Sequence, residues 1–277
     1  MPDVIEKLNH SIVQHGSYNR RIYLMKLHER DMPSIVPALE RLARENGYEK
    51  ILVKTPARNR DGFAKEGYYQ EAIIPQYFKD REDAAFMAKY FSSVRRRVKD
   101  RQRIDTILSQ AHRYEQTRSY QTNDRFWKAQ ICQPDDAAEM SRLYKAVFKT
   151  YPFPVFDPHF LIESINHHVT YFCIRTDNRI VALAASEKDP DNLAVEMTDF
   201  ATLSGHRSQG MASCLLSAME HEMIQQGLKT AFSIARSFSP EINITFVKNG
   251  YRFGGTLGNN TNIAGRIESM NIWYKHL

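Results

Sequence analysis

Hydrophobic and polar residues switch between two spacings along the second half of the chain. Short apolar runs bounded by Asp, Asn, Gly or Pro predict strands at 126–133, 169–175, 179–188, 193–203 and 229–236, and around 251–257 and 269–277. Apolar residues at helical spacing, often with Pro or Asp at the start or Gly at the end, predict helices at 134–148, 159–168, 211–226 and 239–250. "KTYPFPVFDP" (149–158) holds three prolines, so we expect it to be irregular. This order predicts an α/β fold with a mixed sheet.

The first part of the chain is shorter and partly echoes the second. Both contain a strand, a break with Pro, a helix, a Gly-Tyr pair and a further strand. The matching residues are Phe63 with Phe246, Lys65 with Lys248, Gly67 with Gly250 and Tyr68 with Tyr251. We therefore predict a structural repeat. The N-terminal copy has no glycine before its first helix, so we expect it to pack or bind rather than catalyse. The predicted parts are a half-domain at 1–95, a basic helical linker at 96–123 and a main domain at 124–277.

Composition is that of a soluble globular protein. Of the 277 residues, 42% are hydrophobic and 25% charged. No apolar run reaches the roughly 18 residues of a membrane helix, and the N-terminus resembles no secretory signal. Cys132, Cys173 and Cys214 lie far apart and fit no metal or redox spacing. We therefore expect a cytoplasmic protein without a metal site or a membrane contact.

The net charge of +6 is partly local. The segment 92–103 has six Arg or Lys against one Asp, which is compatible with a nucleic-acid footprint or with a solvated helix face in a connector. No aromatic residues are interleaved with these charges, and no nucleic-acid-binding motif is present. The connector is therefore the favoured interpretation, and no nucleic-acid partner is expected.

The segment "SGHRSQGMAS" (204–213) joins a predicted strand to a predicted helix. Its Arg207, Gly210 and Ala212 form R-x-x-G-x-A. The first turn of a helix offers free backbone N–H groups to a phosphate, glycine permits close approach, and arginine adds a charged donor. A glycine at this place is also typical of a tight turn, so the spacing alone leaves both functions open.

The order of elements around this loop resembles the Gcn5-related N-acetyltransferases (GNAT), over about residues 125–277. With the repeat, this resemblance implies a GNAT fold preceded by a smaller, degenerate half-GNAT-like α/β domain at 1–95. That family uses Q/R-x-x-G-x-G/A to hold the pyrophosphate of acetyl-CoA, and "FVKNGY" resembles the end of its late helix. The resemblance implies a cofactor site made by Phe200, Thr202, Leu203, Arg207, Ser208, Gln209, Gly210, Met211, Ala212, Asn243 and Phe246.

Within that family the chain looks like the β-lysine N-acetyltransferases. The similar runs are "MTDFATLSGHRSQGMASCLLSAMEHEMIQQGLKTAFSIAR", "GTLGNNTNIAGRIESMNIWYK" and, in the first part, "GYEKILVKTPAR". The resemblance implies acetylation of the ε-amine of β-lysine to give Nε-acetyl-β-lysine, a compatible solute used in osmoadaptation. The substrate comes from this resemblance alone. A homodimer and a lid over the acceptor site are both possible uses of the N-terminal part.

The strand before the loop carries two candidate bases. Glu196 lies eleven residues before Arg207, the spacing of the general base in Gcn5-type histone acetyltransferases. The same sequence would result if Glu196 were only a salt-bridged carboxylate or one that faces the edge of the sheet. Asp199 is the rival, but on a regular strand it faces the opposite side from Glu196, unless a β-bulge restores it. The family's oxyanion donor is a backbone N–H, here near residues 200–202.

Two further roles are less determined. Many family members have a Tyr proton donor where this chain has Phe246, so the thiolate leaves unassisted or Ser237, Ser239 or Tyr251 replaces the donor. For the acceptor, Tyr151 and Phe153 are candidates to pack the methylene chain, and Asn259, Asn260 and Glu268 to bind its polar groups. Loop packing and a polar turn are the alternatives. Acetylation of a polyamine or protein lysine, or CoA binding without catalysis, would leave the same cofactor residues.

Overall fold

The computed structural model describes residues 3–116 and 127–277. Their strands form one continuous mixed sheet in the order β1-β2-β3-β4-β6-β5-β12-β13-β11-β10-β9-β8-β7. The α/β fold predicted from the pattern is confirmed. The predicted strand at 126–133 and linker at 96–123 each extend into the range 117–126, which lies outside the described residues. No helix in the described part of the chain is both long and apolar enough to cross a membrane.

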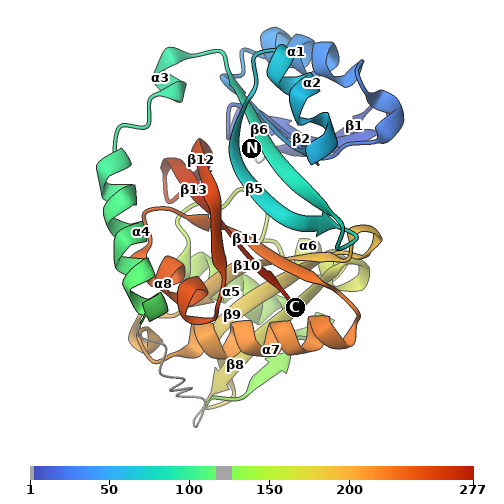
Figure 1. Ribbon diagram of the computed structural model, residues 1–277. Coiled ribbons are helices and arrows are strands. Elements are labelled where there is room, and N and C mark those ends of the chain that lie inside the picture. Colours follow the sequence, from blue (N-terminus) through green and yellow to red (C-terminus); the bar gives the residue numbers. More distant parts are fainter. Residues whose placement is uncertain (1–2, 117–126) are drawn as a thin grey trace.

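The second half follows the predicted order closely. Its elements are β7 (Ala129–Ile131), α5 (Ala137–Val147), α6 (Pro158–His167), β8 (Val169–Thr176), β9 (Arg179–Asp189), β10 (Ala194–Thr202), α7 (Met211–Gln225), β11 (Thr230–Arg236), α8 (Pro240–Lys248), β12 (Arg252–Ile263) and β13 (Arg266–His276). The apolar stripes of α7 and α8 pack on one face of these strands, and those of α5 and α6 pack on the other face. The sheet is thus covered on both sides in this half (Figure 1).

The first half is made of β1 (Val4–Leu8), β2 (Ser11–Gly16), β3 (Arg21–Lys26), α1 (Ile35–Glu45), β4 (Lys50–Pro56), α2 (Arg60–Lys65), β5 (Tyr69–Phe78) and β6 (Glu82–Tyr90). Its strand order β2-β3-β4-β6-β5 repeats the order β9-β10-β11-β13-β12 of the second half. Strand directions repeat as well, because β3–β4 and β10–β11 are the parallel pairs and their neighbours are antiparallel. The predicted repeat therefore has a topological counterpart, while its derivation from half a GNAT domain stays a prediction.

Glycines permit the close contact that joins the two halves. β5 meets β12 at the pair Ala72 and Gly255. A Cβ on Gly254 would lie 2.5 Å from the carbonyl oxygen of Ile73, and one on Gly255 would lie 2.3 Å from that of Glu71. Only glycine allows the two backbones to approach this closely.

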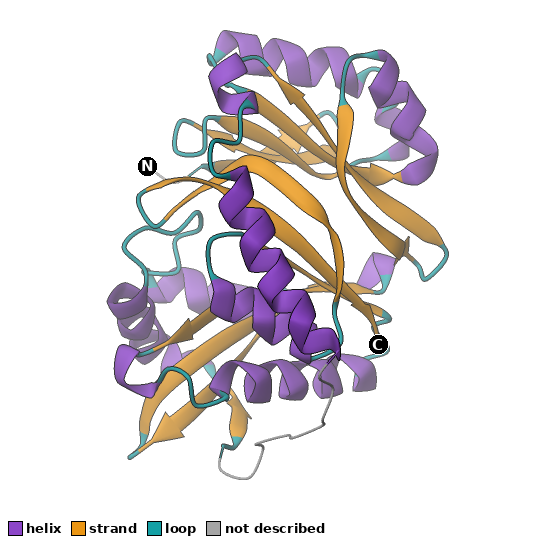
Figure 2. Ribbon diagram, turned by 60° about the vertical axis from the view of Figure 1, so that its left-hand side comes forward, coloured by secondary structure: helices purple, strands orange, loops and turns teal. Residues whose placement is uncertain are grey.

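The inner face of the N-terminal strands packs against the second half. α1 and α2 cover the outer face (Figures 1 and 2). On the inner face, Tyr23, Leu52 and Ile74 belong to the same buried cluster as Phe232 and Ile272 of the second half. The N-terminal half thus lies over the part of the second half's sheet that α5 and α6 leave uncovered.

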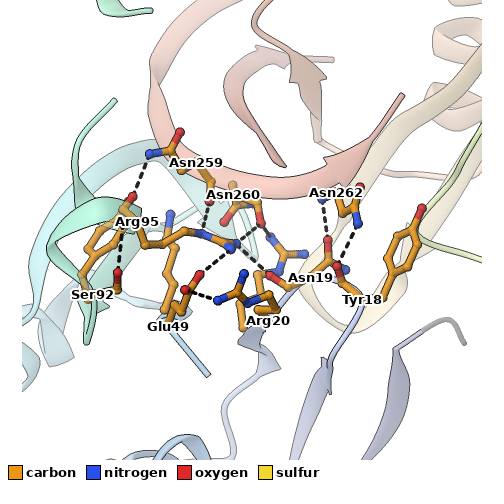
Figure 3. Close-up of polar contacts among 12 residues, drawn as sticks. Tyr18, Asn19, Arg20, Glu49, Ser92, Arg95, Asn259, Asn260 and Asn262 are labelled. Carbon is orange, nitrogen blue, oxygen red and sulfur yellow. Dashed lines mark hydrogen bonds and ion pairs between the residues drawn. The ribbon is translucent and has the colours of Figure 1, made fainter. Parts of the chain in front are cut away.

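The basic segment at 92–103 forms α3 (Ser93–Arg96) and the start of α4 (Arg101–Gln116). Arg95 is 5% exposed and donates hydrogen bonds to the carbonyls of Asn19 and Asn259, with Glu49 beside it (Figure 3). The expectation that this run is a solvated helix face is therefore wrong for Arg95, because its guanidinium links both halves. After α3, the helix α4 lies beside the second half and packs along α8 (Figure 1).

Candidate active site

A large cavity, of about 1630 Å³, lies where the two halves meet. Its walls include the start of α7, the inner ends of β10 and β11, the irregular segment before α6, and strands β2 to β4 of the first half. Predicted site residues that line it are Tyr151, Phe153, Glu196, Asp199, Phe200, Thr202, Arg207, Ser208, Gly210, Met211, Ala212 and Asn260. The fold therefore brings the phosphate loop and the candidate bases into one space.

The loop before α7 has the shape that a phosphate needs. Gly210 is the residue before the helix, with φ of +79°, and Ser208 also has a positive φ of +62°. No side chain in the described residues caps the first turn of α7, so its first N–H groups are available to a ligand. A Cβ on Gly210 would meet nothing within 4 Å. Arg207 is exposed beside this turn, and the arrangement fits the pyrophosphate of acetyl-CoA.

Strands β10 and β11 separate inside the cavity. Their parallel pairing runs from Ala194 to Glu196 and ends where Glu196 faces Phe232. Beyond this point β10 has a register shift against β9 between Thr198 and Ala201, and Asp199 has φ of +57°. The β-bulge considered from the sequence is confirmed. It turns Asp199 to the cavity side, so both carboxylates line the same space despite their opposite parity.

The surroundings of Glu196 favour its protonated form. Burial raises the pKa of Glu196 to about 8, and the charge of Glu187 adds to the increase, while Lys54 opposes it. Glu187 is the cross-strand partner of Glu196 on β9, so the two like charges lie side by side. A carboxylate with such a pKa is a suitable proton acceptor near neutral pH.

Asp199 has a different set of partners. Its Oδ1 accepts hydrogen bonds from the hydroxyls of Tyr151 and Thr198. Burial raises the pKa of Asp199 to about 6, and the hydrogen bond from Tyr151 works in the opposite direction. The ring of Tyr151 also stacks on Phe148. The proline-rich segment thus brings an aromatic side chain directly onto one of the candidate bases.

The first half contributes charged residues that sequence reasoning missed. Lys54 on β4 donates a hydrogen bond of 2.7 Å to Tyr77, and Tyr77 donates one of 3.3 Å to Asp189 on β9. Arg21 and Gln14 lie on β3 and β2 and also line the cavity. Their only sequence signal was a charged or polar side chain within an otherwise apolar strand.

Other predicted cofactor residues lie outside the cavity walls. The amide of Asn243 is buried and donates to the carbonyls of Arg236 and Ser239, while its oxygen accepts from Asn271 and Trp273. Its polar atoms thus fix the start of α8 against the sheet, so the expected contact of this side chain with the cofactor is corrected.

Three further cofactor candidates also lie outside the walls. Phe246 is a fully buried core residue whose ring packs edge-on against Phe200. Leu203 packs into the apolar clusters on both faces of the sheet. The side chain of Gln209 is directed back to the carbonyl of Gly205. For Phe246 and Leu203, an apolar residue near the loop looks the same in sequence whether it contacts a ligand or the core.

Two predicted substrate residues serve the architecture instead. The amide of Asn259 donates to the carbonyls of Arg95 and Arg97 and so ties β12 to the connector (Figure 3). Glu268 is 1% exposed and is paired with Arg236 and Arg266. Both side chains already have strong partners, and neither lines the cavity, which corrects the expectation of substrate contact.

Of the three candidates for the proton donor, one lines the cavity and two do not. Ser239 lines the cavity, and its hydroxyl bonds to Glu241. Ser237 and Tyr251 do not line it. Tyr251 packs against Phe246 instead, on the α7 and α8 side of the sheet.

Among the described residues, one group of possible metal ligands lies close together: His10, His28 and Asp31. Asp31 already accepts hydrogen bonds from the backbone and ring of His10 and from the hydroxyl of Ser11. These bonds account for its buried carboxylate without an ion.

Comparisons with known proteins agree with this geometry. The model of the acetyltransferase (GNAT) family matches residues 137–246. A protein of Methanococcus maripaludis, named β-lysine N(6)-acetyltransferase, is 36% identical over 99% of each chain. A protein of Methanosarcina mazei with the same name is 30% identical over 88% of this chain and 97% of its own. The N-acetyltransferase YodP of Bacillus subtilis is 31% identical over 96% of each chain. The similarity thus includes the N-terminal half.

Proposed function

We propose that this chain, which belongs to the acetyltransferase (GNAT) family and is an acetyl-CoA-dependent N-acetyltransferase, acetylates the ε-amine of β-lysine. The product is Nε-acetyl-β-lysine, which we expect to act as a compatible solute in the cytoplasm. The observation that carries the proposal is the cavity that joins the start of α7 to Glu196, Asp199 and the inner strands of the first half. The names of the two archaeal relatives supply the acceptor.

In this proposal the loop and first turn of α7 hold the pyrophosphate through backbone N–H groups, with Arg207 as an added donor. The pantetheine arm then enters between the separating strands β10 and β11. Acetyl-CoA supplies a thioester whose carbonyl carbon accepts the amine. The bulge at Asp199 and Phe200 leaves both residues without a partner on β9, so their backbone is available to the developing oxyanion.

The acceptor must lose a proton before it attacks, because an alkyl ammonium has a pKa near 10.4. Glu196 receives that proton, directly or through one water, and Asp199 is the alternative acceptor. The amine nitrogen then bonds to the carbonyl carbon, the C–S bond breaks, and CoA leaves as the thiolate. The raised pKa of Glu196 matches this task, because a stronger base gains more from accepting the proton.

The proposal is tested by following CoA release with purified protein and a panel of amines. The panel is β-lysine, α-lysine, spermidine and a lysine peptide, with mass spectrometry and NMR to locate the new acetyl group. We expect β-lysine to have the highest kcat/KM and the acetyl group to be on the ε-nitrogen. A clear preference for spermidine or the peptide, or acetylation of the β-nitrogen, would contradict it.

The assembly state is a separate proposal. We infer a homodimer, which sedimentation equilibrium of the purified protein tests directly. A monomer across the concentration range would refute the dimer and leave the catalytic proposal unchanged.

A further inference from the structure

A buried arginine lines the far end of the cavity. Arg21 on β3 is 5% exposed and donates hydrogen bonds to the carbonyl of Asn260 at 3.0 Å, the hydroxyl of Thr261 at 3.3 Å and the amide oxygen of Gln14 at 3.3 Å. All of these acceptors are neutral. Among residues 3–116 and 127–277, the structure gives Arg21 no carboxylate partner in an ion pair.

Polar atoms around this arginine also lack partners. In the described structure, Nε of Arg21, Nε2 of Gln14 and Oδ1 of Asn260 are buried and have no hydrogen bond. Gln14 and Asn260 are each 1% exposed, and all three residues line the cavity. Native proteins rarely leave such groups unsatisfied, and two of these atoms are N–H donors. A cluster of buried donors around an unpaired cation is suited to an anion.

The burial of the Arg21 guanidinium without an anionic partner also costs free energy. Desolvation lowers the pKa of Arg21 to about 10, although the guanidinium remains charged at neutral pH. A bound carboxylate would remove most of this cost, because it pairs with the charge and accepts the free N–H groups. The site therefore gains more from an anionic ligand than an exposed arginine would.

Arg21 and the candidate bases line one cavity, and Tyr23 links them along it. Arg21 and Tyr23 are two residues apart on β3 and lie on the same face, with the guanidinium 5.4 Å from the centre of the Tyr23 ring. Tyr23 in turn lies close enough to Glu196 for that charge to raise its pKa, after the larger effect of burial. The carboxylate and ε-nitrogen of β-lysine, six bonds apart, are separated by about 7–8 Å when extended.

From these observations we propose that Arg21, with the amide of Gln14, binds the carboxylate of the acceptor while its ε-amine lies at Glu196. This inference rests on the proposed function and deepens it, because it assigns substrate selection to the N-terminal half. Arg21 would be a specificity-determining residue that favours an amino acid over a polyamine of similar length. Asn260 holds the guanidinium of Arg21 in place through its carbonyl.

Lys54 is another buried cation that the first half brings to the cavity. Its amine already donates to Tyr77, and the charges of Asp189, Glu196 and Glu187 surround it. A carboxylate placed there would face three acidic groups. Lys54 is therefore better placed to balance those groups than to bind the acceptor's carboxylate.

The test compares β-lysine with the diamine that results from its decarboxylation, in the full-length protein. For wild type we expect a much higher kcat/KM on β-lysine. For Arg21→Gln we expect kcat/KM on β-lysine to fall about 100-fold, with a KM effect larger than the kcat effect, while activity on the diamine changes little. Arg20→Gln is the matched control, because Arg20 is the exposed neighbour that pairs with Glu49. It should behave as wild type.

The ratio of the two substrates within one variant separates recognition from folding, since a folding defect lowers both activities equally. If Arg21→Gln keeps the wild-type ratio, or if Lys54→Met loses the ratio instead, the carboxylate site at Arg21 is refuted and the proposed function stands. If wild type does not acetylate β-lysine but prefers another amino acid over its decarboxylated amine, and Arg21→Gln loses that preference, the proposed function fails and the carboxylate site stands.

Discussion

Tyr151 donates a hydrogen bond from its hydroxyl to Oδ1 of Asp199 across the active-site cavity. The two residues are 48 positions apart, one in the proline-rich segment and one at the bulge of β10. The bond opposes the effect of burial on Asp199, whose pKa still rises to about 6. In the proposed mechanism, this pair therefore couples the acceptor pocket to one of the candidate bases.

Removing this hydroxyl should raise the pKa of Asp199 further. A hydrogen bond to a charged group that is lost in Tyr151→Phe corresponds to about one pKa unit. The inflection of the pH–rate profile that disappears in Asp199→Asn should move to higher pH by that amount in Tyr151→Phe. An inflection at an unchanged pH would show that the bond does not control Asp199.

Glu196→Gln should lower kcat/KM about 100-fold near pH 8, because the amide accepts no proton. In wild type the rate should rise with pH and level off above about 8, the pKa to which burial raises Glu196. In the variant the rate should continue to rise toward the pKa of the free amine, which gives partial rescue. A variant profile with the wild-type shape would refute Glu196 as the base.

Glu187→Gln is the matched variant for this measurement. The charge of Glu187 helps to raise the pKa of Glu196, so its removal should move the rising limb to lower pH while kcat at high pH stays near wild type. A fall in kcat as large as that of Glu196→Gln would mean that the two carboxylates cannot be assigned separate roles.

Glu196 should also make stability depend on pH. In the unfolded chain a glutamate releases its proton near pH 4.3, whereas in the folded protein the pKa is about 8. Between these values the folded state binds more protons, so the free energy of unfolding falls as pH rises. Glu196→Gln removes this dependence and should be more stable than wild type at pH 9, by up to about 5 kcal/mol, but not at pH 4. Urea denaturation of both proteins at pH 4 and pH 9 measures the difference in their free energies of unfolding. The same difference at both pH values would contradict the prediction.

Gly210→Glu should abolish acetyl-CoA binding, because a carboxylate would then stand where the phosphate is expected. Gly227→Glu is a matched control at the other end of α7. Both glycines have a positive φ, +79° and +80°, with nothing within 4 Å of a new Cβ, so the backbone strain is similar. Calorimetry with CoA should show loss of binding for Gly210→Glu and normal binding for Gly227→Glu. Normal binding by both would refute the phosphate loop.

The order of elements and the loop could be predicted because their signals are local. Prolines at 152 and 154, Gly210 and Gly250 each act through the backbone of their own segment. The bulge that turns Asp199 to the cavity of Glu196 is suggested by the family resemblance, since Asp199 on a regular strand would face the other side. These features need no knowledge of what packs against the strand.

The roles of Asn243 and Arg21 depend on distant partners. Asn243 at the start of α8 is bonded to Trp273, thirty residues later, and nothing in its own segment distinguishes this from a ligand contact. Arg21 is buried only because β3 packs against the second half, with its acceptor at Asn260 239 residues away. Such assignments require the packing of segments far apart in the chain, within the second half for Asn243 and between the halves for Arg21.

Gly255→Ala tests the contact that joins the two halves. Gly255 has φ of +140°, and an added Cβ would lie 2.3 Å from the carbonyl oxygen of Glu71 and 2.6 Å from Cα of Ala72. Neither backbone atom can move without disturbing the pairing of β5 with β12, so the free energy of unfolding should fall by about 3 kcal/mol or more. Gly62→Ala, in α2 with its nearest contact at 3.6 Å, is the control and should be neutral or slightly stabilising.

The kinetic consequence of Gly255→Ala should be selective. The first half supplies Arg21 and Gln14 to the cavity, whereas the phosphate loop belongs entirely to the second half. A shift of the first half relative to β12 should therefore raise KM for the amine acceptor by about tenfold or more while acetyl-CoA binding changes little. Equal weakening of both substrates, measured at a temperature where the variant is folded, would mean that the second half also depends on this contact for its shape.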